Sequence, residues 1–143
     1  MQSNRTYIIL QLGAIIGAFL LWALISFTPI YSVRVIELSL WDWLKIVCIY
    51  PLLEEYVFRG FLWEELRRKL YPNKAYSGHL IVAVTSLLFL FTHMVFREIN
   101  IIFFMLISFY LGYLRLFGKR LLVTIATHVF WNFGWLITTQ YLI

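Results

Sequence analysis

The sequence predicts an all-α fold, a polytopic transmembrane bundle of about five helices that forms one domain over residues 1–143. Of the residues, 62% are hydrophobic and only 13% are charged, and the mean hydropathy is +0.83. A soluble domain is roughly half apolar and about one quarter charged. Because so apolar a surface would aggregate in water, we expect lipid to replace the solvent around most of the chain. A chain of this length is expected to form one domain.

Five apolar runs supply the expected helices. A helix crosses the hydrocarbon with about 20 apolar residues, and the expected spans are 7–31, 38–66, 80–96, 99–117 and 121–143. The first run exceeds the roughly 7–15 apolar residues of a signal peptide. It also ends in Thr28-Pro29 rather than at a small-residue cleavage site. We therefore expect a retained span.

The basic residues between these runs predict the orientation. One side, formed by the N-terminus and the segments after the second and fourth runs, carries Arg5, Arg67, Arg68, Lys69, Lys74, Arg115, Lys119 and Arg120. The other side carries Arg34, Lys45 and Arg97. Cytoplasmic loops are enriched in Lys and Arg, so we expect a cytoplasmic N-terminus and an external C-terminus. These charges lie in the short gaps between apolar runs and do not form a soluble basic face. We therefore expect membrane lipid and no nucleic acid as a partner.

The second apolar run contains ionisable side chains. A charge at the bilayer centre costs roughly 2.5–3.5 kcal/mol, so Glu54, Glu55 and Arg59 should face the bundle interior. Glu55 and Arg59 are four residues apart in the favourable order for a helical ion pair. That pair has a purely structural interpretation as well as a functional one. Glu54 is rotated by about 100° from its neighbour, which leaves its carboxylate freer for another partner. Pro51 cannot donate to the Val47 carbonyl, which predicts a kink.

Two later runs add polar groups with helical spacing. His93 follows Phe89 by four residues, and His128 precedes Asn132 by four, so each pair shares a helix face. A lone histidine on an apolar face is usually structural, but these groups join Glu54 in a chain with few others at that depth. A carboxylate and an imidazole can activate water and protonate a leaving amine. A second imidazole and a carboxamide can stabilise an oxyanion. The set is typical of peptide hydrolysis without a covalent intermediate, and the sequence contains neither GxSxG nor HExxH.

Three motifs in this order resemble a known family. Residues 54–59 read EExxxR, residues 89–93 read FxxxH and residues 128–132 read HxxxN. The chain thus resembles, over about 43–135, the CPBP (Abi) family of intramembrane proteases. That family includes the CAAX prenyl endopeptidases, which remove the last three residues of prenylated proteins.

The resemblance implies a role for each motif residue. Glu54 would activate water together with His93. His128 and Asn132 would stabilise the oxyanion, and Glu55 with its arginine partner, Arg59, would support the site. This mechanism needs no metal or other cofactor. A zinc enzyme stays open as an alternative, because Glu54, His93 and His128 are residue types that ligate zinc.

The implied function is an intramembrane endopeptidase in a cell membrane, the inner membrane of a bacterium. Its substrate would be a membrane-associated protein or peptide, from which it trims a C-terminal or sorting segment. Two alternatives stay open. A proton-coupled carrier also uses buried Glu and His, although the sequence shows no internal repeat of the kind on which many transporters are built. The other is a non-catalytic immunity or scaffold protein on the same fold.

Overall fold

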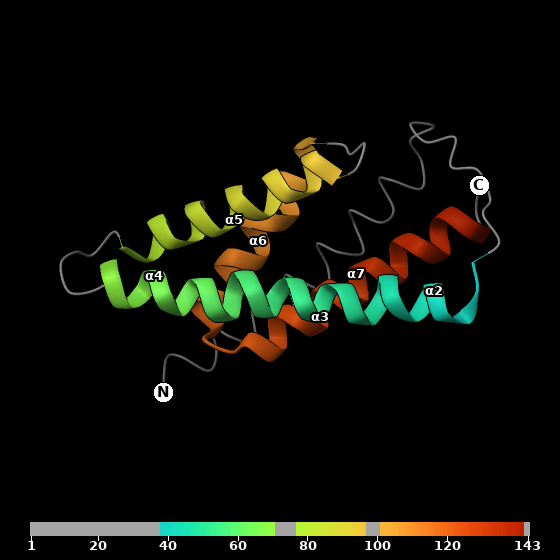
Figure 1. Cartoon of the computed structure of the whole chain (residues 1–143), viewed down its shortest axis with the longest axis horizontal. Helices are drawn as coiled ribbons and strands as arrows, with labels where there is room; N and C mark the ends of the chain where they lie inside the picture. The colour runs from blue at the N-terminus through green and yellow to red at the C-terminus, as the bar shows by residue number, and fades with distance from the viewer. Residues whose placement is uncertain (1–37, 71–76, 97–100, 142–143) are drawn as a thin grey trace. The chain divides into compact units, whose positions relative to one another are not determined.

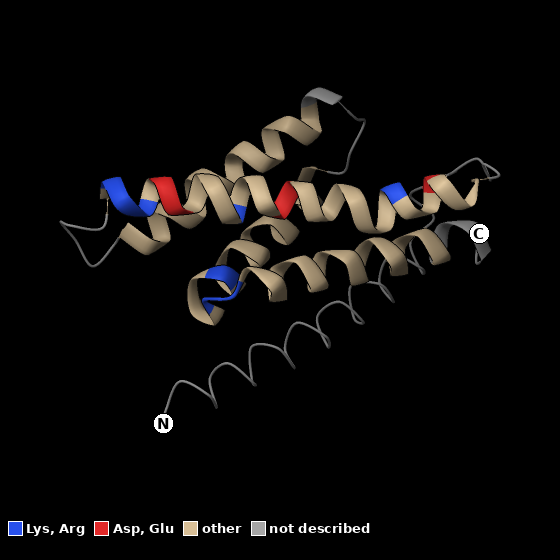
Figure 2. Cartoon of the chain, turned by 60° about the horizontal axis from the view of Figure 1, so that its bottom comes forward, with Lys and Arg blue, Asp and Glu red and all other residues tan. Residues whose placement is uncertain are grey.

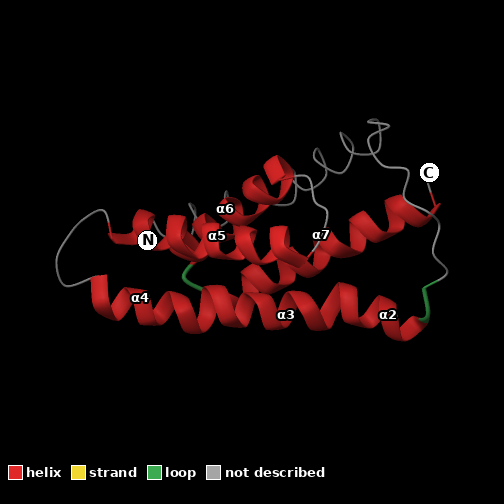
Figure 3. Cartoon of the chain, turned by 45° about the horizontal axis from the view of Figure 1, so that its top comes forward, coloured by secondary structure: helices red, strands yellow, loops and turns green. Residues whose placement is uncertain are grey.

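The computed structural model describes residues 38–70, 77–96 and 101–141. These residues are almost entirely helical and include no β-strand (Figure 3). The predicted all-α class is therefore confirmed for the described part of the chain. The first expected span, 7–31, lies outside the described residues, and the prediction of one domain over residues 1–143 stays untested.

The second expected span is one long helical run with two π-helical segments in it. Its elements are α2 (Leu40–Leu44), η1 (Lys45–Ile49), α3 (Tyr50–Glu55), η2 (Tyr56–Leu62) and α4 (Trp63–Leu70). The Ser39 side chain caps its start by accepting a hydrogen bond from the Asp42 N–H. The run ends four residues later than the predicted 66, because the charges of α4 pair with one another along the helix. Arg67 pairs with Glu64, for example, at 2.7 Å.

The structure modifies the predicted effect of Pro51. Pro51 has no backbone N–H, and the π-helical segment η1 ends two residues before this proline. A π-helix pairs each N–H with the carbonyl five residues earlier, whereas an α-helix uses the carbonyl four residues earlier. The carbonyl that would pair with residue 51 in this register is therefore that of Ile46 and not that of Val47.

The remaining helices agree with the last three expected spans. They are α5 (Ser77–Phe96), α6 (Ile101–Gly118) and α7 (Leu121–Tyr141) (Figure 1). Within the described residues, the segment Ser77–Met94 is the one helix long and apolar enough to cross a membrane, and Phe104–Gly118 and Leu121–Ile137 are shorter apolar helices. The count of five spans and the orientation stay predictions.

Helices α5 and α6 approach each other closely at a glycine. A Cβ atom on Gly112 would lie 2.9 Å from Val82 Cγ1 and 3.0 Å from Ser86 Oγ. The short distance allows two reciprocal hydrogen bonds between the helices: Ser86 Oγ donates to the Ser108 carbonyl at 2.9 Å, and Ser108 Oγ donates to the Ser86 carbonyl at 3.1 Å. A buried hydroxyl needs such a partner, so the glycine and the two serines act together.

Polar and apolar side chains are distributed as expected for a lipid-facing bundle. Large apolar side chains are exposed on several helices, among them Phe61, Phe91, Ile102 and Leu122. Charged and hydroxyl side chains are instead fully buried, among them Glu55, Arg59, Ser86, Ser108 and Thr124. Lys and Arg gather at the end of α4 and around the turn between α6 and α7 (Figure 2). Ionisable groups inside a membrane protein face its interior, as Glu55 and Arg59 do.

The chain divides into two compact units, which are described separately. One consists of Met1–Leu52 and Ala126–Ile143, and the other of Leu53–Ile125. The second unit has an apolar core around Trp63, Ile81 and Val82.

Candidate active site

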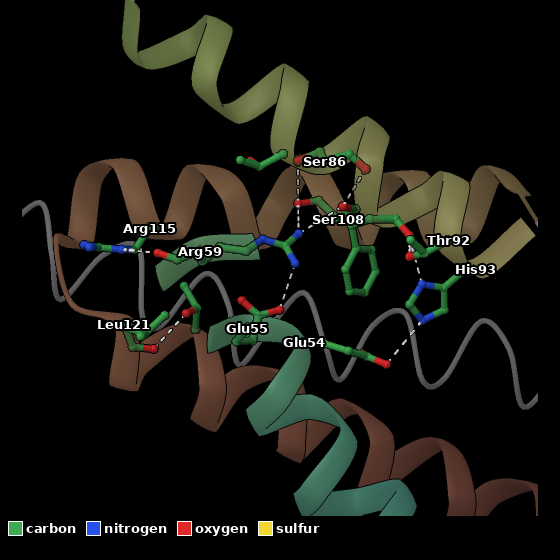
Figure 4. A network of polar contacts seen from close by, with 12 residues as sticks. Glu54, Glu55, Arg59, Ser86, Thr92, His93, Ser108, Arg115 and Leu121 are labelled. Carbon is green, nitrogen blue, oxygen red and sulfur yellow. Dashed lines mark hydrogen bonds and ion pairs between the residues drawn. The ribbon is translucent and has the colours of Figure 1, made fainter. Parts of the chain in front are cut away.

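Glu54 and His93 come together within the unit Leu53–Ile125. Glu54 lies in α3 and His93 near the end of α5, and the Glu54 Oε1 atom is 3.8 Å from His93 Nε2 (Figure 4). The imidazole is buried, whereas the side chain of Glu54 is 26% exposed. A direct hydrogen bond would span about 2.7–3.2 Å. The observed separation is instead suited to a water molecule that contacts both groups.

The backbone of α5 determines which nitrogen of the His93 ring carries the proton. The other nitrogen, which faces Glu54, then has the lone pair. Nδ1 lies 2.9 Å from the carbonyl oxygen of Phe89, one turn earlier. A carbonyl only accepts hydrogen bonds, so Nδ1 carries the proton, and in the neutral imidazole Nε2 is the basic nitrogen. The rings of Phe89 and Phe104 lie against the imidazole, with centroids 4.3 Å and 5.1 Å away. The FxxxH spacing thus positions the ring as well as its proton.

The second acid and the arginine of the first motif form the expected ion pair. Arg59 Nη1 is 2.9 Å from Glu55 Oε1, and both side chains are 0% exposed. The two residues lie one helical turn apart, on the boundary of α3 and η2. The pairing that their spacing predicted is therefore present in the structure.

Arg59 also connects this pair to the α5–α6 contact and to His93. Its Nη2 donates to the carbonyl and to the Oγ of Ser108, each at 2.9 Å. Its guanidinium lies over the Phe89 ring, 4.5 Å from the centroid. The Phe89 ring in turn lies against the His93 ring in a tilted arrangement, so a continuous set of contacts joins the ion pair to the imidazole (Figure 4). Sequence reasoning missed Ser108, whose only signal was a short hydroxyl inside an apolar run.

A side chain also stabilises the widened backbone of η2. Arg115 Nε donates to the carbonyl of Arg59 at 3.0 Å, and its Nη2 contacts Glu64 at 2.9 Å. The shift in backbone pairing along a π-helix makes such side-chain donors useful, and π-helical turns are frequent at functional sites. Here the π-helical turn begins directly after the two acids of the motif.

The third motif lies in the other unit, on α7. His128 is buried, and Asn132 is one helical turn further on. The Asn132 carboxamide nitrogen donates to the Ile46 carbonyl of η1 at 2.9 Å. Near this bond the rings of Trp43 and Phe133 meet edge to face, with centroids 6.4 Å apart. Because the two motif pairs belong to different units, the assembly of all four residues into one site stays a prediction.

A zinc site would need several metal-ligating side chains close together. Among the described residues, no three or more His, Cys, Asp or Glu side chains form a group that could hold a metal ion. The cofactor-free mechanism and the zinc alternative both stay predictions.

Comparison with known proteins tests the resemblance carried by the motifs. The family model of the type II CAAX prenyl endopeptidases, Rce1-like, matches residues 35–134. The chain belongs to this family. The Rce1-like region contains all three motifs, so the resemblance predicted from them is confirmed.

A curated relative agrees with the assignment. The membrane-embedded CAAX protease MroQ of Staphylococcus aureus (strain USA300) is 37% identical over 92 residues, which make up 64% of this chain and 36% of the relative. The chain therefore spans little more than a third of the length of that relative. No solved structure matches the chain significantly.

Proposed function

We propose that this protein is an intramembrane endopeptidase in which Glu54 and His93 activate the attacking water. The observation that carries the proposal is the 3.8 Å separation between the Glu54 carboxylate and His93 Nε2. Family membership and the many exposed apolar side chains support a protease that acts at the membrane.

The two groups suit a hydrolytic water on chemical grounds. A water between them can donate one hydrogen to the carboxylate and the other to Nε2, which polarises it for attack. As its oxygen bonds to the scissile carbonyl carbon, Glu54 accepts a proton and the carbonyl oxygen becomes an oxyanion. The carboxylic acid then protonates the departing amide nitrogen as the C–N bond breaks. One water is consumed, and a new carboxyl and a new amine form.

In this proposal His128 and Asn132 hold the oxyanion. An imidazole N–H and a carboxamide N–H are suitable donors, and an oxyanion-hole donor acts on charge that develops only during the reaction. The buried Glu55–Arg59 pair supports the site through Phe89 and does not itself take part in proton transfer.

The proposed substrate is a membrane-associated protein or peptide that loses a C-terminal or sorting segment. The relative's name describes a CAAX protease, and the family model describes prenyl endopeptidases. A prenylated C-terminal peptide is therefore the first probe, and the proposed location is a bacterial inner membrane.

The substitution Glu54→Gln tests the mechanism. Glutamine keeps the shape of the side chain but cannot accept the proton, so the rate should fall by about 10²–10⁴-fold, the usual contribution of a general base. Cleavage is measured on a quenched fluorescent prenylated CAAX peptide, and C-termini of membrane proteins are compared between cells with each variant. Binding of the peptide should persist.

Glu65→Gln is the matched control, because this acid lies in α4 and its partners are the exposed Arg68 and Lys69. It should leave cleavage unchanged. If Glu54→Gln cleaves as well as the parent, the mechanism is wrong, and the carrier and scaffold alternatives regain priority.

A further inference from the structure

The carbonyl group of Ile46 lies where Pro51 interrupts the backbone hydrogen bonding of the long helical run. In η1 the N–H of Tyr50 donates to the carbonyl of Lys45, five residues earlier. The next donor in this register would be residue 51, which as a proline has no N–H. Within the described helix, the backbone donors four and five residues after Ile46 are therefore committed elsewhere or absent. A backbone carbonyl removed from water requires a donor.

Asn132 supplies that donor from a distant part of the sequence. Its Nδ2 lies 2.9 Å from the Ile46 oxygen, and both residues belong to the unit of Met1–Leu52 and Ala126–Ile143. Because the carbonyl can only accept, the bond also determines which way the carboxamide faces, with nitrogen toward η1. The amide nitrogen carries two hydrogens, so this bond uses one and leaves the other for a second acceptor.

We propose that Pro51 is a positioning residue for Asn132. By removing the backbone donor of the Ile46 carbonyl, it creates the acceptor that holds the carboxamide in one orientation. The second N–H of that carboxamide is then preset to bind the oxyanion. This last step rests on the proposed function, whereas the coupling of Pro51 to Asn132 through Ile46 does not.

A double-mutant cycle in thermal stability tests the coupling without any activity. In the parent, Asn132→Ala leaves the Ile46 carbonyl without its donor and should lower the Tm in detergent. In the Pro51→Ala background, the new N–H of residue 51 can reach that carbonyl, so the same substitution should lower the Tm less. The buried proline ring is lost in both arms of that comparison, and its packing effect therefore cancels.

The outcome of the cycle is decisive in both directions. A smaller Tm loss from Asn132→Ala in the Pro51→Ala background supports the inference. Equal losses in the two backgrounds would overturn it, since independent substitutions add. Leu52→Ala, next in sequence with a half-exposed side chain and an N–H already present, is the control background and should leave the loss from Asn132→Ala unchanged.

The cleavage rate of the quenched prenylated peptide tests the functional step. Pro51→Ala should reduce kcat, at most by the about 10²–10³-fold that loss of one oxyanion-hole donor costs, with little change in KM. The double variant should cleave no more slowly than Asn132→Ala alone. If the Tm values are coupled but Asn132→Ala retains full activity, the positioning stands and the proposed oxyanion role is wrong.

Discussion

At the scale of single residues, Arg59 is a fully buried charged side chain, whose charge needs compensation from its neighbours. The two terminal nitrogens of its guanidinium donate to Glu55 and to both oxygens of Ser108, and its plane lies over Phe89, while its Nε has no hydrogen-bond partner among the described residues. A buried ion pair often contributes little net stability compared with apolar residues. Removing one partner is costly, however, because the other charge stays behind without compensation.

We therefore expect Arg59→Ala to lower the free energy of unfolding by about 3–5 kcal/mol, as measured by thermal unfolding in detergent. The matched control is Arg68→Ala, since the Arg68 side chain is 72% exposed and pairs with Glu65. An exposed pair contributes about 0–1 kcal/mol. Equal losses for the two variants would contradict the supporting role of the buried pair.

A mechanism without a metal ion leads to a prediction about the two residues Glu54 and His93. If Glu54 and His93 act without a metal, cleavage of the quenched prenylated peptide should continue after dialysis against a strong chelator. A zinc enzyme would lose activity and regain it when zinc is returned. Loss followed by zinc-specific recovery would replace the glutamate mechanism with the zinc alternative.

At the scale of helices, close packing of α5 on α6 provides the hydroxyl partners that Arg59 uses. Gly112 leaves the space for Val82 and Ser86, and the approach allows the reciprocal bonds between Ser86 and Ser108. Small residues let helix backbones approach in membranes, where burial of apolar area offers little driving force between helices.

Gly112→Ala should accordingly destabilise the protein by about 1–3 kcal/mol, the usual cost of overfilling a packed interface. Thermal unfolding in detergent measures the effect. Gly60→Ala serves for comparison, because the closest atom to its added Cβ would be the far end of the flexible Leu121 side chain at 3.2 Å, and its other neighbours would lie at ordinary contact distance. A Gly112→Ala variant no less stable than Gly60→Ala would show that the two helices can separate without cost.

At the scale of the whole molecule, the distribution of charge predicts how the chain lies in the membrane. Eight basic residues fall on the expected cytoplasmic side and three on the other, namely Arg34, Lys45 and Arg97. The basic end of α4 and the α6–α7 turn belong to the side with more Lys and Arg (Figure 2). Such a bias directs topology.

Reporter fusions test this orientation. A reporter joined after Ile143 should report the outside, and one inserted between Lys119 and Arg120 should report the cytoplasm, because those residues carry the cytoplasmic charge. The inserted reporter is the internal reference for the other. A cytoplasmic signal at both positions would mean that the number of spans is not five.

Local features of the molecule were predictable from its sequence. Composition determined the helical membrane class, and apolar run length located four helices to within a few residues of their observed ends. The Glu55–Arg59 pair and the Phe89–His93 contact were also predictable, since residues four apart on a helix share a face whatever surrounds them.

Only the tertiary structure decided the partners that come from different helices. Three contacts join residues that are far apart in sequence. They are the approach of Glu54 to His93, the hydrogen bond from Arg59 to Ser108 and the hydrogen bond from Asn132 to Ile46. No helical period encodes such distances, because they depend on which helices pack together and on where π-helical turns shift the register. Serine and backbone carbonyl groups also give no charge signal, so their roles become visible only once the helices are packed.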